Sequence, residues 1–512
     1  MRDTVSIDEI SSFCKRKGFV YPSGEVYGSL AGFWDYGHLG VELKNNIKQH
    51  WWKQFVHMRD DVVGIDGAII THPKVWVGSG HADHFEDILV ECNSCHIRLR
   101  ADHLIEDTLH IPADSLSAKK IDEILSKHKV KCPSCQKGTF QPAMRFNLMF
   151  STQVGPVTHQ SSKAFLRPET AQLIFTDLRL VQDNARQKLP FGIAQAGKVF
   201  RNEISPRDFL FRSREFEIME IEYFLHPKHF KKCPFFSSIK DRTISVLSAE
   251  AQQKNKKQKI TKIGELVRQG SLKSEWHAYW LIQMYDWFLS LGVSEKHLRL
   301  REHLPDERAH YSSACFDIDY AFPFGWKEIH GCADRTTFDV EQHQILSKKD
   351  LRIFDEETKE KVIPYVIEPS QGFERAFLAF IFEAYNYDKK RGYVVLHLHP
   401  SLAPYKAGIF PLVQNNDKLV LYAREVYVRL KDRFVCFWDQ GGSVGRRYAR
   451  ADEQGVPFCI TVDFDSLKDK SVTIRDRDST KQIRIPVSEL VEVLENLLAQ
   501  KISFKEGGKL IN

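Results

Sequence analysis

A stretch of alternating apolar and charged residues, from Gln195 to Tyr223, constrains the fold of this chain most strongly. Lys198–Arg201 mixes apolar and basic side chains in a strand-like run, and Pro206 to Asp208 breaks that run with a turn. From Phe209 to Phe224, apolar side chains again alternate with glutamates, as in a strand with one buried face. The sequence therefore predicts two strands joined by a loop.

The charges of this predicted hairpin point to an anionic ligand. Four arginines lie within fourteen positions, with glutamates among them; they are Arg201, Arg207, Arg212 and Arg214. The planar guanidinium group suits bidentate contacts with phosphate, and the ring of Phe216 can stack on a base. A surface hairpin crossed by salt bridges would show the same charges. The residues alone leave both interpretations open.

The sequence F-R-N-E-I-S-P-R followed by F-R-S-R-E-F resembles the second signature motif of class II aminoacyl-tRNA synthetases. Its flanks, with F-E-I-M-E-I-E-Y-F, are similar to the glycyl-tRNA synthetase branch. The resemblance implies an antiparallel sheet on which ATP binds in a bent form. It also implies roles for five residues: Arg201 on the α-phosphate, Glu203 near the adenine amino group, Phe216 stacked on adenine, and Arg212 or Arg214 facing the outer phosphates.

The third signature of the same family is matched by V-I-E-P-S-Q-G-F-E-R, which ends at Arg375 and runs into an apolar helix. A helix N-terminus can bind phosphate, and an arginine in the first turn opposes the helix dipole unless an anion is near. The resemblance places Arg375 over the adenine and near the γ-phosphate, and turns Glu368 and Ser370 toward the amino acid. Phe373-Glu374 departs from the glycine-rich pattern of the class.

Three further segments resemble substrate-contacting parts of the glycyl branch. They are R-A-D-H with Arg100, R-P-E-T with Glu169, and G-W-K-E-I-H-G-C-A-D-R-T with Glu328 and Arg335. The resemblance gives Glu169 to the α-amine, Glu328 to ATP and its Mg²⁺, and Arg335 to the neighbourhood of the substrate. Without it, Arg100 would be read as part of a solvated strand face, and Glu169 as a first-turn glutamate favoured by the helix dipole.

The implied site residues form two sets. The ATP-binding set is Arg201, Asn202, Glu203, Phe211, Arg212, Arg214, Phe216, Glu328, Ile329, Gly372 and Arg375. The glycine-binding set is Arg100, Glu169, Phe216, Glu217, Glu220, Arg335, Glu368 and Ser370. Arg201 and Arg375 are predicted to be catalytic, because charge builds on the phosphate oxygens during the reaction. Glu328 is predicted to bind magnesium.

Two C-x-x-C pairs form a separate candidate site. Cys92, Cys95, Cys132 and Cys135 offer four thiolates, a set that suits tetrahedral zinc. The 36 residues between the pairs exceed the usual zinc-ribbon spacing. Redox pairs and free buried cysteines are the alternatives, and we expect structural zinc.

The length of 512 residues predicts several domains. We expect an α+β catalytic domain, built on an antiparallel sheet flanked by helices, and a C-terminal α/β anticodon-binding domain, because strands and helices alternate near the end of the chain. The predicted boundaries are 1–90 and 146–390 for the catalytic domain, 91–145 for a zinc-ribbon-like insertion, 226–300 for a helical insertion within the catalytic domain, and 391–512 for the anticodon-binding domain.

Three local patterns carry predictions of their own. Ser6 to Glu9 resembles a helix start, and the helix would end at Gly18. In the predicted helix 41–55, apolar residues recur every four positions; they would face the core or, as the family resemblance implies, a dimer partner. The lysine-rich run 254–259 is either solvated or in contact with RNA.

Composition limits the class of protein. A net charge of +6, from 73 basic and 67 acidic residues, permits a polyanionic partner without requiring one. No apolar run is long enough to span a bilayer, and the polar start of the chain does not resemble a signal peptide. We expect a cytoplasmic protein.

The resemblance implies ATP-dependent attachment of glycine to tRNA(Gly) through a glycyl-adenylate, with tRNA(Gly), glycine and a second copy of the chain as partners. A pocket without room for a β-carbon rejects larger amino acids sterically, so no editing domain is expected. Two alternatives stay open: a synthetase of the same subgroup for another amino acid, and a tRNA-binding paralogue without activity.

Overall fold

The structure, a computed structural model, describes residues 5–111, 113, 116–156, 162–309 and 311–511. The first four residues of the polar N-terminal segment lie outside these ranges. Helix α1 (Ile7–Lys17) begins after Ser6, whose side chain accepts a hydrogen bond from the backbone of Glu9, and ends at Gly18, which has a φ of 83°. The predicted helix is confirmed, because a serine cap and a left-handed glycine delimit it.

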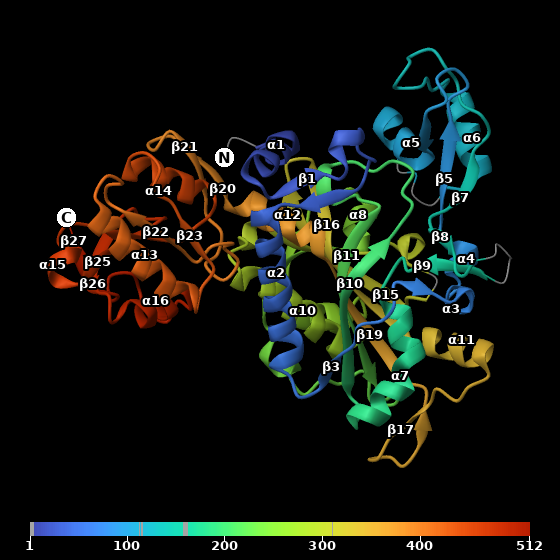
Figure 1. Cartoon of the computed structure of the whole chain (residues 1–512). Helices are drawn as coiled ribbons and strands as arrows, with labels where there is room; N and C mark the ends of the chain where they lie inside the picture. The colour runs from blue at the N-terminus through green and yellow to red at the C-terminus, as the bar shows by residue number, and fades with distance from the viewer. Residues whose placement is uncertain (1–4, 112, 114–115, 157–161, 310, 512) are drawn as a thin grey trace.

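The predicted hairpin is present at the centre of the molecule. Strands β10 (Phe191–Phe200) and β11 (Glu215–Leu225) are antiparallel, with Phe200 opposite Glu215. They belong to a nine-stranded sheet with the order β13-β12-β14-β15-β16-β19-β11-β10-β3 (Figure 1). Its strand pairs are antiparallel except β3 with β10 and β12 with β14. The expected antiparallel catalytic sheet is confirmed.

The other strands of the large sheet are β3 (Val62–Gly64), β12 (Thr243–Leu247), β13 (Lys259–Lys262), β14 (Leu298–Glu302), β15 (Ala314–Phe322), β16 (Gly325–Thr336) and β19 (Tyr365–Gly372). Small sheets border it, formed by β1 (Val20–Pro22) with β2 (Trp34–Tyr36), β4 (Ile70–Thr71) with β9 (Lys163–Leu166) and β8 (Ser151–Gln153), β17 (Ile353–Phe354) with β18 (Lys361–Val362), and β20 (Tyr385–Asp388) with β21 (Tyr393–Leu396).

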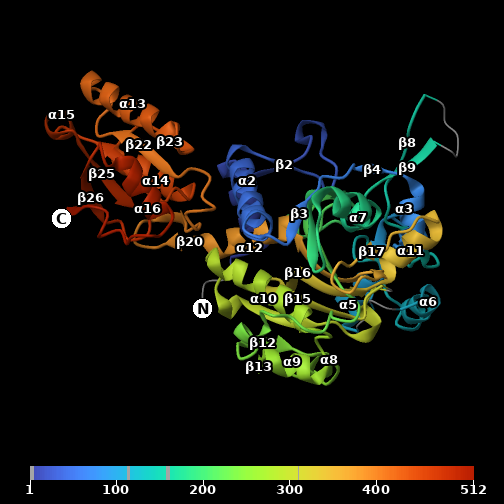
Figure 2. The ribbon, with the colours of Figure 1, turned by 90° about the horizontal axis from the view of Figure 1, so that it is seen from below.

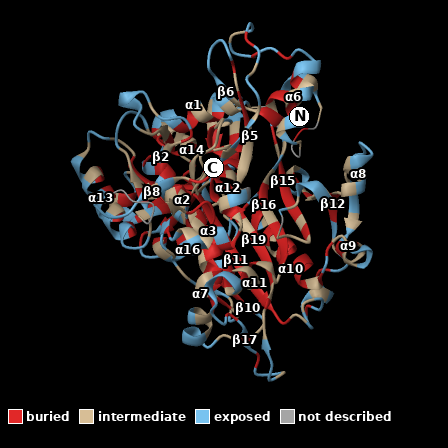
Figure 3. Cartoon of the chain, turned by 90° about the vertical axis from the view of Figure 1, so that its right-hand side faces the viewer, coloured by how far each residue is buried: buried red, intermediate tan, exposed pale blue. Residues whose placement is uncertain are grey.

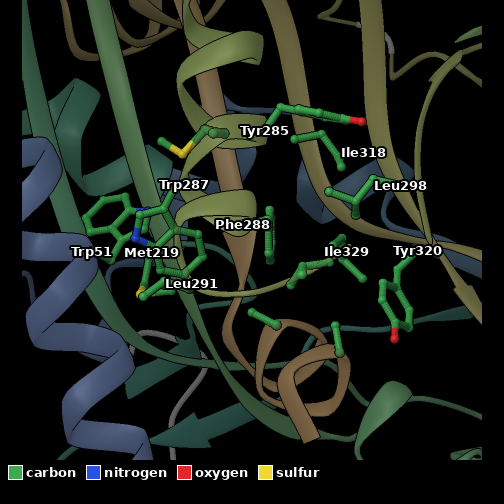
Figure 4. Close-up of a cluster of buried hydrophobic side chains, with 14 of the residues drawn as sticks. Trp51, Met219, Tyr285, Trp287, Phe288, Leu291, Leu298, Ile318, Tyr320 and Ile329 are labelled. Carbon is green, nitrogen blue, oxygen red and sulfur yellow. The ribbon is translucent and has the colours of Figure 1, made fainter. Parts of the chain in front are cut away.

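Helices cover both faces of the large sheet. On one face lie α2 (His38–Trp52), α10 (Glu275–Ser290) and α12 (Phe373–Ala384), whose apolar side chains form the main core (Figure 4). On the other face, α7 (Ala171–Ala185) packs against β10 and β11, and α11 (Phe338–Ser347) packs against α7 and β16, in a second cluster. Strands β11 and β19, and β16 from Ile329 onward, are accordingly mostly buried (Figure 3).

Helix α2 shows where the apolar residues of the predicted helix 41–55 lie. Its stripe of Leu43, Ile47 and Trp51 is fully buried within the chain, and Phe55 in the turn that follows packs on Trp51. The stripe therefore faces the chain's own core. The expectation that this region also borders a dimer partner stays a prediction.

The segment 226–300 differs from the expected helical insertion. Besides α8 (Ala249–Gln253), α9 (Ile263–Gln269) and α10, it contains β12, β13 and most of β14, which extend the large sheet at one edge (Figure 2). The aromatic stripe of Trp276, Trp280 and Trp287 belongs to α10 and is buried in the main core. The segment is thus mixed α/β and part of the large sheet, because its strands continue the same ladder.

The cysteine-containing insertion has a core of its own. Its sheet is β6-β5-β7, formed by β5 (Glu86–Glu91), β6 (Arg98–Arg100) and β7 (Met144–Asn147). Helices α5 (Ala101–Leu109) and α6 (Ala118–Lys127) pack together on this sheet. Two short helices, α3 (Pro73–Gly78) and α4 (His81–His84), connect it to strand β4 of the small sheet β4-β9-β8.

The C-terminal domain is α/β, as predicted. Its sheet, β23-β22-β24-β25-β26-β27, is parallel around β22 and antiparallel beyond β24. The strands are β22 (Ala407–Pro411), β23 (Cys436–Trp438), β24 (Phe458–Val462), β25 (Ser471–Asp476), β26 (Gln482–Pro486) and β27 (Lys509–Ile511). The helices are α13 (Asp417–Lys431), α14 (Val444–Glu453), α15 (Ser466–Asp469) and α16 (Leu490–Leu498).

Salt bridges join this domain to the rest of the chain. Lys17 of α1 pairs with Glu453 of α14 at 2.6 Å, and Arg391 of the β20–β21 hairpin pairs with Asp452 at 3.0 Å. Across the described residues, no helix combines the length and apolar character that crossing a bilayer requires.

Candidate active site

A cavity of about 320 Å³ opens where the hairpin, β19 and the start of α12 meet. Its walls include ten of the predicted site residues: Arg100, Arg201, Glu203, Phe211, Arg212, Phe216, Glu328, Ser370, Gly372 and Arg375. Arg201 and Arg375, which are far apart in the sequence, therefore line one cavity. Phe85, Asp87, Leu148, Leu210, Ser213, Ile218 and Glu374 complete the walls.

Arg201 lies between two aromatic rings. Its guanidinium carbon is 5.3 Å from the ring centroid of Phe216 and 5.4 Å from that of Phe85. Its Nε donates to the backbone carbonyl of Pro168 at 3.1 Å. These contacts fix the guanidinium at the cavity wall, next to the ring that was expected to stack on a base.

Arg375 lines the same cavity from the first turn of α12. Its guanidinium stacks over Phe211 at 4.6 Å and pairs with the carboxylate of Glu328 at 2.9 Å. Although burial opposes ionisation, Arg375 and the neighbouring His303 lower the pKa of Glu328 to about 2. The carboxylate is therefore ionised at neutral pH and supplies the anion that an arginine at a helix N-terminus requires.

The cysteine-containing insertion forms part of the same wall. Its His103 lies 3.2 Å from Arg212, and its Arg100 pairs with Asp87 at 3.0 Å. Burial lowers the pKa of His103 to about 3, so this histidine is neutral beside two arginines. Arg212 also lies 3.7 Å from Glu203. The insertion thus helps to orient two arginines of the cavity.

A buried carboxylate cluster adjoins the cavity at Ser370. The Ser370 hydroxyl donates to Glu220 at 2.8 Å, and the backbone N–H of Thr170 donates to the other oxygen of Glu220 at 3.0 Å. Glu169 pairs with His81 at 3.1 Å, and Glu368 accepts from Arg335 at 2.7 Å.

The strand geometry explains the cluster. Side chains alternate across β11, so Phe216, Ile218 and Glu220 share the face that α7 covers, while Met219 and Ile221 enter the main core. Because Glu220 lies opposite Ser370 in the β11–β19 pair, the two meet directly. The apolar–polar alternation therefore places the aromatic wall and the carboxylates in one row.

The electrostatics of the cluster favour a cationic ligand. Burial raises the pKa of Glu368 to about 8, although Arg335 opposes this shift. Burial and the neighbouring Glu169 raise the pKa of Glu220. Burial disfavours ionised Glu169 too, yet His81 and Arg335 hold its pKa below the usual range. A cation placed among these carboxyls would stabilise their ionised forms.

Comparison with known proteins decides the family. The anticodon binding domain family matches residues 406–497. The glycine--tRNA ligase of Bacillus thuringiensis subsp. konkukian is 43% identical over 506 residues, which cover 98% of this chain and 100% of the relative. The enzymes of Geobacillus thermodenitrificans and Caldanaerobacter subterraneus subsp. tengcongensis are each 44% identical, over 96% of this chain and 98% and 99% of their own lengths.

The chain belongs to the glycine--tRNA ligase family.

Some residues expected from this family lie outside the cavity. Glu217 points to the opposite face of β11, where it pairs with Lys44 and, at 2.6 Å, with Lys48. Arg214 donates to the carbonyls of Glu203 and Ala31 at 2.9 and 3.0 Å. The odd position of Glu217 along the strand explains its direction, and carbonyl binding makes Arg214 a brace of the hairpin loop.

Two further members of the expected ATP set, Asn202 and Ile329, are not among the residues that line the cavity. Asn202 donates its backbone N–H to the carbonyl of Leu148 at 2.7 Å, and Ile329 is fully buried in the main core. Glu169, Glu220, Arg335 and Glu368 gather in the carboxylate cluster instead. The structure therefore groups the expected residues around two adjoining sites.

The sequence left several residues of the cavity and the carboxylate cluster unassigned: Thr170, His81, Glu222, Asp339 and Glu374. Thr170 follows the predicted Glu169 in the sequence, and Glu374 precedes the predicted Arg375. Their positions next to predicted site residues could therefore have indicated them. The alternation along β11 puts Glu222 two positions beyond Glu220 on the same face. His81 and Asp339 come from short segments whose position only tertiary packing defines.

The four cysteines converge at the tip of the insertion. The sulfurs of Cys92 and Cys135, and those of Cys95 and Cys132, are 3.7 Å apart, and all four lie within 4.8 Å of one another. Metal–sulfur bonds of about 2.3 Å in a tetrahedron give a similar separation. The four thiols could therefore hold zinc. The long spacer between the pairs is explained by α5 and α6, which it contains.

Gly138 shows how closely the chain folds around these sulfurs. A Cβ at this position would lie 2.3 Å from Sγ of Cys92, so a larger residue would displace the thiol. The backbone N–H of Gly138 donates to Cys135, and that of Ser94 donates to Cys92. Backbone donors of this kind stabilise thiolates, which are the metal-binding form.

Proposed function

We propose that the cavity binds ATP, that the carboxylate cluster binds the ammonium group of glycine, and that glycyl-adenylate forms where the two sites meet. One observation carries this proposal: Ser370 lines the cavity and also donates to Glu220. A glycine held by the carboxylates would thus point its own carboxylate toward the arginines. The family relationship supports glycine as the amino acid.

The chemistry requires positioning and charge stabilisation. The carboxylate oxygen of glycine attacks the α-phosphorus, the bond to the bridging oxygen breaks, and pyrophosphate leaves with the electron pair. Arg201 stabilises the charge that develops on the α-phosphate oxygens, and Arg375 and Arg212 balance the charge of the leaving group. The 3′-terminal hydroxyl of tRNA then attacks the glycyl carbonyl, and AMP leaves.

One side chain of the cavity is suited to bind magnesium. Glu328 is an ionised carboxylate on the wall, a ligand that Mg²⁺ accepts. Because this carboxylate already pairs with Arg375, ion and arginine would share its oxygens. Magnesium would supply neutralisation of the phosphate charge.

Structural zinc at Cys92, Cys95, Cys132 and Cys135 is part of the proposal. The sulfur separations support it, as does the independent core of the insertion. Zinc would hold the tip of the insertion together, and the insertion in turn carries His103 and Arg100 to the cavity.

Partners and location complete the proposal. The C-terminal domain, which matches an anticodon-binding family, would bind the tRNA(Gly) anticodon, and the chain would work as a cytoplasmic homodimer. The lysines of the run 254–259 are mostly exposed and could contact the tRNA. Sedimentation of the purified protein would establish the oligomeric state.

Glycine-dependent ATP–pyrophosphate exchange tests the proposed function. We expect exchange with glycine and none with alanine or serine, because the amine pocket would leave no room for a β-carbon. Exchange with another amino acid would favour a synthetase of different specificity. Absence of exchange with any amino acid would favour a non-catalytic tRNA-binding protein.

A further inference from the structure

Glu222 lies deeper in the sheet than the carboxylates assigned to the amine. It follows Glu220 by two positions on β11 and shares its face. The β11–β19 register pairs Glu220 with Ser370 and Tyr223 with Ile367, which places Glu222 opposite Glu368. Directly opposite residues of an antiparallel pair have Cβ atoms about 4.5–5.5 Å apart. Two carboxyls are thus cross-strand neighbours inside the protein.

The two carboxyls have unequal surroundings. Glu368 accepts a hydrogen bond from Arg335 at 2.7 Å. Glu222 has an exposed fraction of 0%, and neither of its oxygens has a hydrogen-bond partner among the described residues. Its neighbour on the other side, across β10, is the apolar Ile193. An ionised carboxylate in such a position has lost its hydration without compensation, and this costs several kcal/mol.

Other charges around the pair do not change this contrast. The groups that face it are Glu220 on β11, Arg335 and Cys332 on β16, Cys315 on β15, Asp339 on α11, Glu169 before α7, and Tyr311. Arg335 is the cation in contact with the carboxyls, and it is shared by Glu368 and Asp339. Burial, and to a lesser extent the negative charge of the neighbouring Glu368, raises the pKa of Glu222 well above its usual value.

We infer that Glu222 holds its proton at neutral pH, so that Arg335 and a bound ammonium group ionise Glu368 alone, which makes Glu222 a positioning residue of the amine pocket. Two carboxyls this close do not both ionise without a cation between them. The proton resides on Glu222 because Arg335 stabilises the charge on Glu368. The role of Glu368 toward the glycine amine rests on the proposed function, whereas the proton on Glu222 does not.

The proton can be counted without substrate. A glutamate in an unfolded chain has a pKa of about 4.3, so Glu222 loses its proton when the protein unfolds at pH 7. Mixing with guanidinium chloride in weak buffer, with a pH indicator, measures the protons released. We expect wild type to release about one proton more per chain than Glu222→Gln. Glu215→Gln, on the solvent edge of the same strand, is the control and should match wild type.

Kinetics tests the positioning role. Glu222→Ala removes the neighbour that positions Glu368 and should raise the glycine KM, whereas Glu222→Gln, which keeps a neutral side chain of nearly the same shape, should rescue most of that loss. A rise of about tenfold or more in the glycine KM of Glu222→Gln would mean that Glu222 is ionised and meets the ammonium itself, which would overturn the inference. An unchanged proton count would overturn it as well.

A second variant guards against misfolding. Glu222→Leu also removes both the charge and the proton, and infrared absorption of protonated carboxyl groups at pH 7 should lose one carboxyl relative to wild type. No loss of this absorption would contradict the inference. If wild type shows no glycine-dependent exchange, the proposed function fails, while the proton count still decides the state of Glu222.

Discussion

Glu374 accepts a hydrogen bond from the backbone N–H of Glu217 at 2.8 Å, at the point where β19 has ended and α12 has begun. The β11–β19 pairing stops at Ile218 and Gly372, so this N–H has no strand partner. The other oxygen of Glu374 accepts from the Tyr36 hydroxyl at 3.1 Å. One buried carboxyl thus fixes the third signature to the second, and sets the position of Phe216 relative to Arg375.

Replacing Glu374 by alanine should weaken both folding and ATP binding. The variant leaves a buried N–H unpaired, at a cost of about 1–3 kcal/mol in the free energy of unfolding. The ATP KM in pyrophosphate exchange should rise, because Phe216 and Arg375 lose their common support. Glu374→Gln keeps an acceptor and should remain close to wild type. Equal stability of the alanine variant and wild type in urea would disprove this role.

The same carboxyl should make stability depend on pH. Burial raises the pKa of Glu374 to about 7, above the value of about 4.3 in an unfolded chain. The native state therefore binds more protons than the unfolded state between these values. The resulting stabilisation is complete below the unfolded pKa and is lost as pH rises through the folded pKa.

Urea unfolding of wild type and Glu374→Gln between pH 4.5 and 8 measures this effect. The difference in unfolding free energy should change by up to about 1.4 kcal/mol per pH unit and level off above pH 7. Wild type should lose stability relative to the glutamine variant as pH rises. Parallel pH curves for the two proteins would show that Glu374 is ionised throughout.

Arg201→Ala should lower glycyl-adenylate formation by about 10²-fold or more, as is typical when one donor to a developing oxyanion is removed. Arg207→Ala is the matched control, since Arg207 belongs to the same hairpin but pairs with Asp107 at the surface, at 3.2 Å. This control should retain wild-type exchange rates. Wild-type exchange in Arg201→Ala would exclude a role for Arg201 in the transition state.

The sequence predicted the positions of some site residues correctly and of others wrongly. Arg201, Phe216 and Arg375 belong to contiguous motifs, so their convergence on one cavity followed once the motifs were recognised. Glu217 shows the limit of that approach: membership in the motif predicted ligand contact, whereas strand alternation turns its side chain toward α2. The alternation was visible in the sequence, but the face that borders the cavity was not.

The same limit explains the segment 226–300. The aromatic residues of α10 recur at helical spacing and are buried in the main core, since such periodicity reports which face of a helix is buried. The strands of the segment are short, and β12 pairs with β14 across about fifty intervening residues. Pairing between segments so distant in the chain depends on the sheet that is already formed, and local patterns do not encode it.

Loss of zinc from the insertion should weaken ATP binding in the cavity. Cys132→Ser should abolish the binding of about one zinc per chain and raise the ATP KM, because His103 and Arg100 lose their fixed positions. Cys436→Ser, in the C-terminal domain, is the control and should retain zinc. Metal analysis and exchange kinetics check both effects. A metal-free Cys132→Ser protein with unchanged ATP KM would separate the cluster from catalysis.

Replacing Asp452 of α14 should destabilise the C-terminal domain and leave the cavity intact. This fully buried carboxylate accepts from Arg475 at 2.8 and 2.9 Å, from Arg391 at 3.0 Å and from Tyr393 at 3.0 Å. Asp452→Ala leaves the buried Arg475 uncompensated, which costs about 3–5 kcal/mol. The neighbouring Glu453→Ala removes only a half-exposed pair with Lys17, worth about 1 kcal/mol or less.

The two variants should therefore differ in the rate at which they transfer glycine to tRNA. In Asp452→Ala, pyrophosphate exchange should persist while tRNA charging falls, because the β20–β21 hairpin no longer holds the C-terminal domain in place relative to the catalytic sheet. Glu453→Ala should charge tRNA normally. Equal loss of exchange and charging in Asp452→Ala would mean that the two domains fold as one cooperative unit, since the cavity contains no residue of α14.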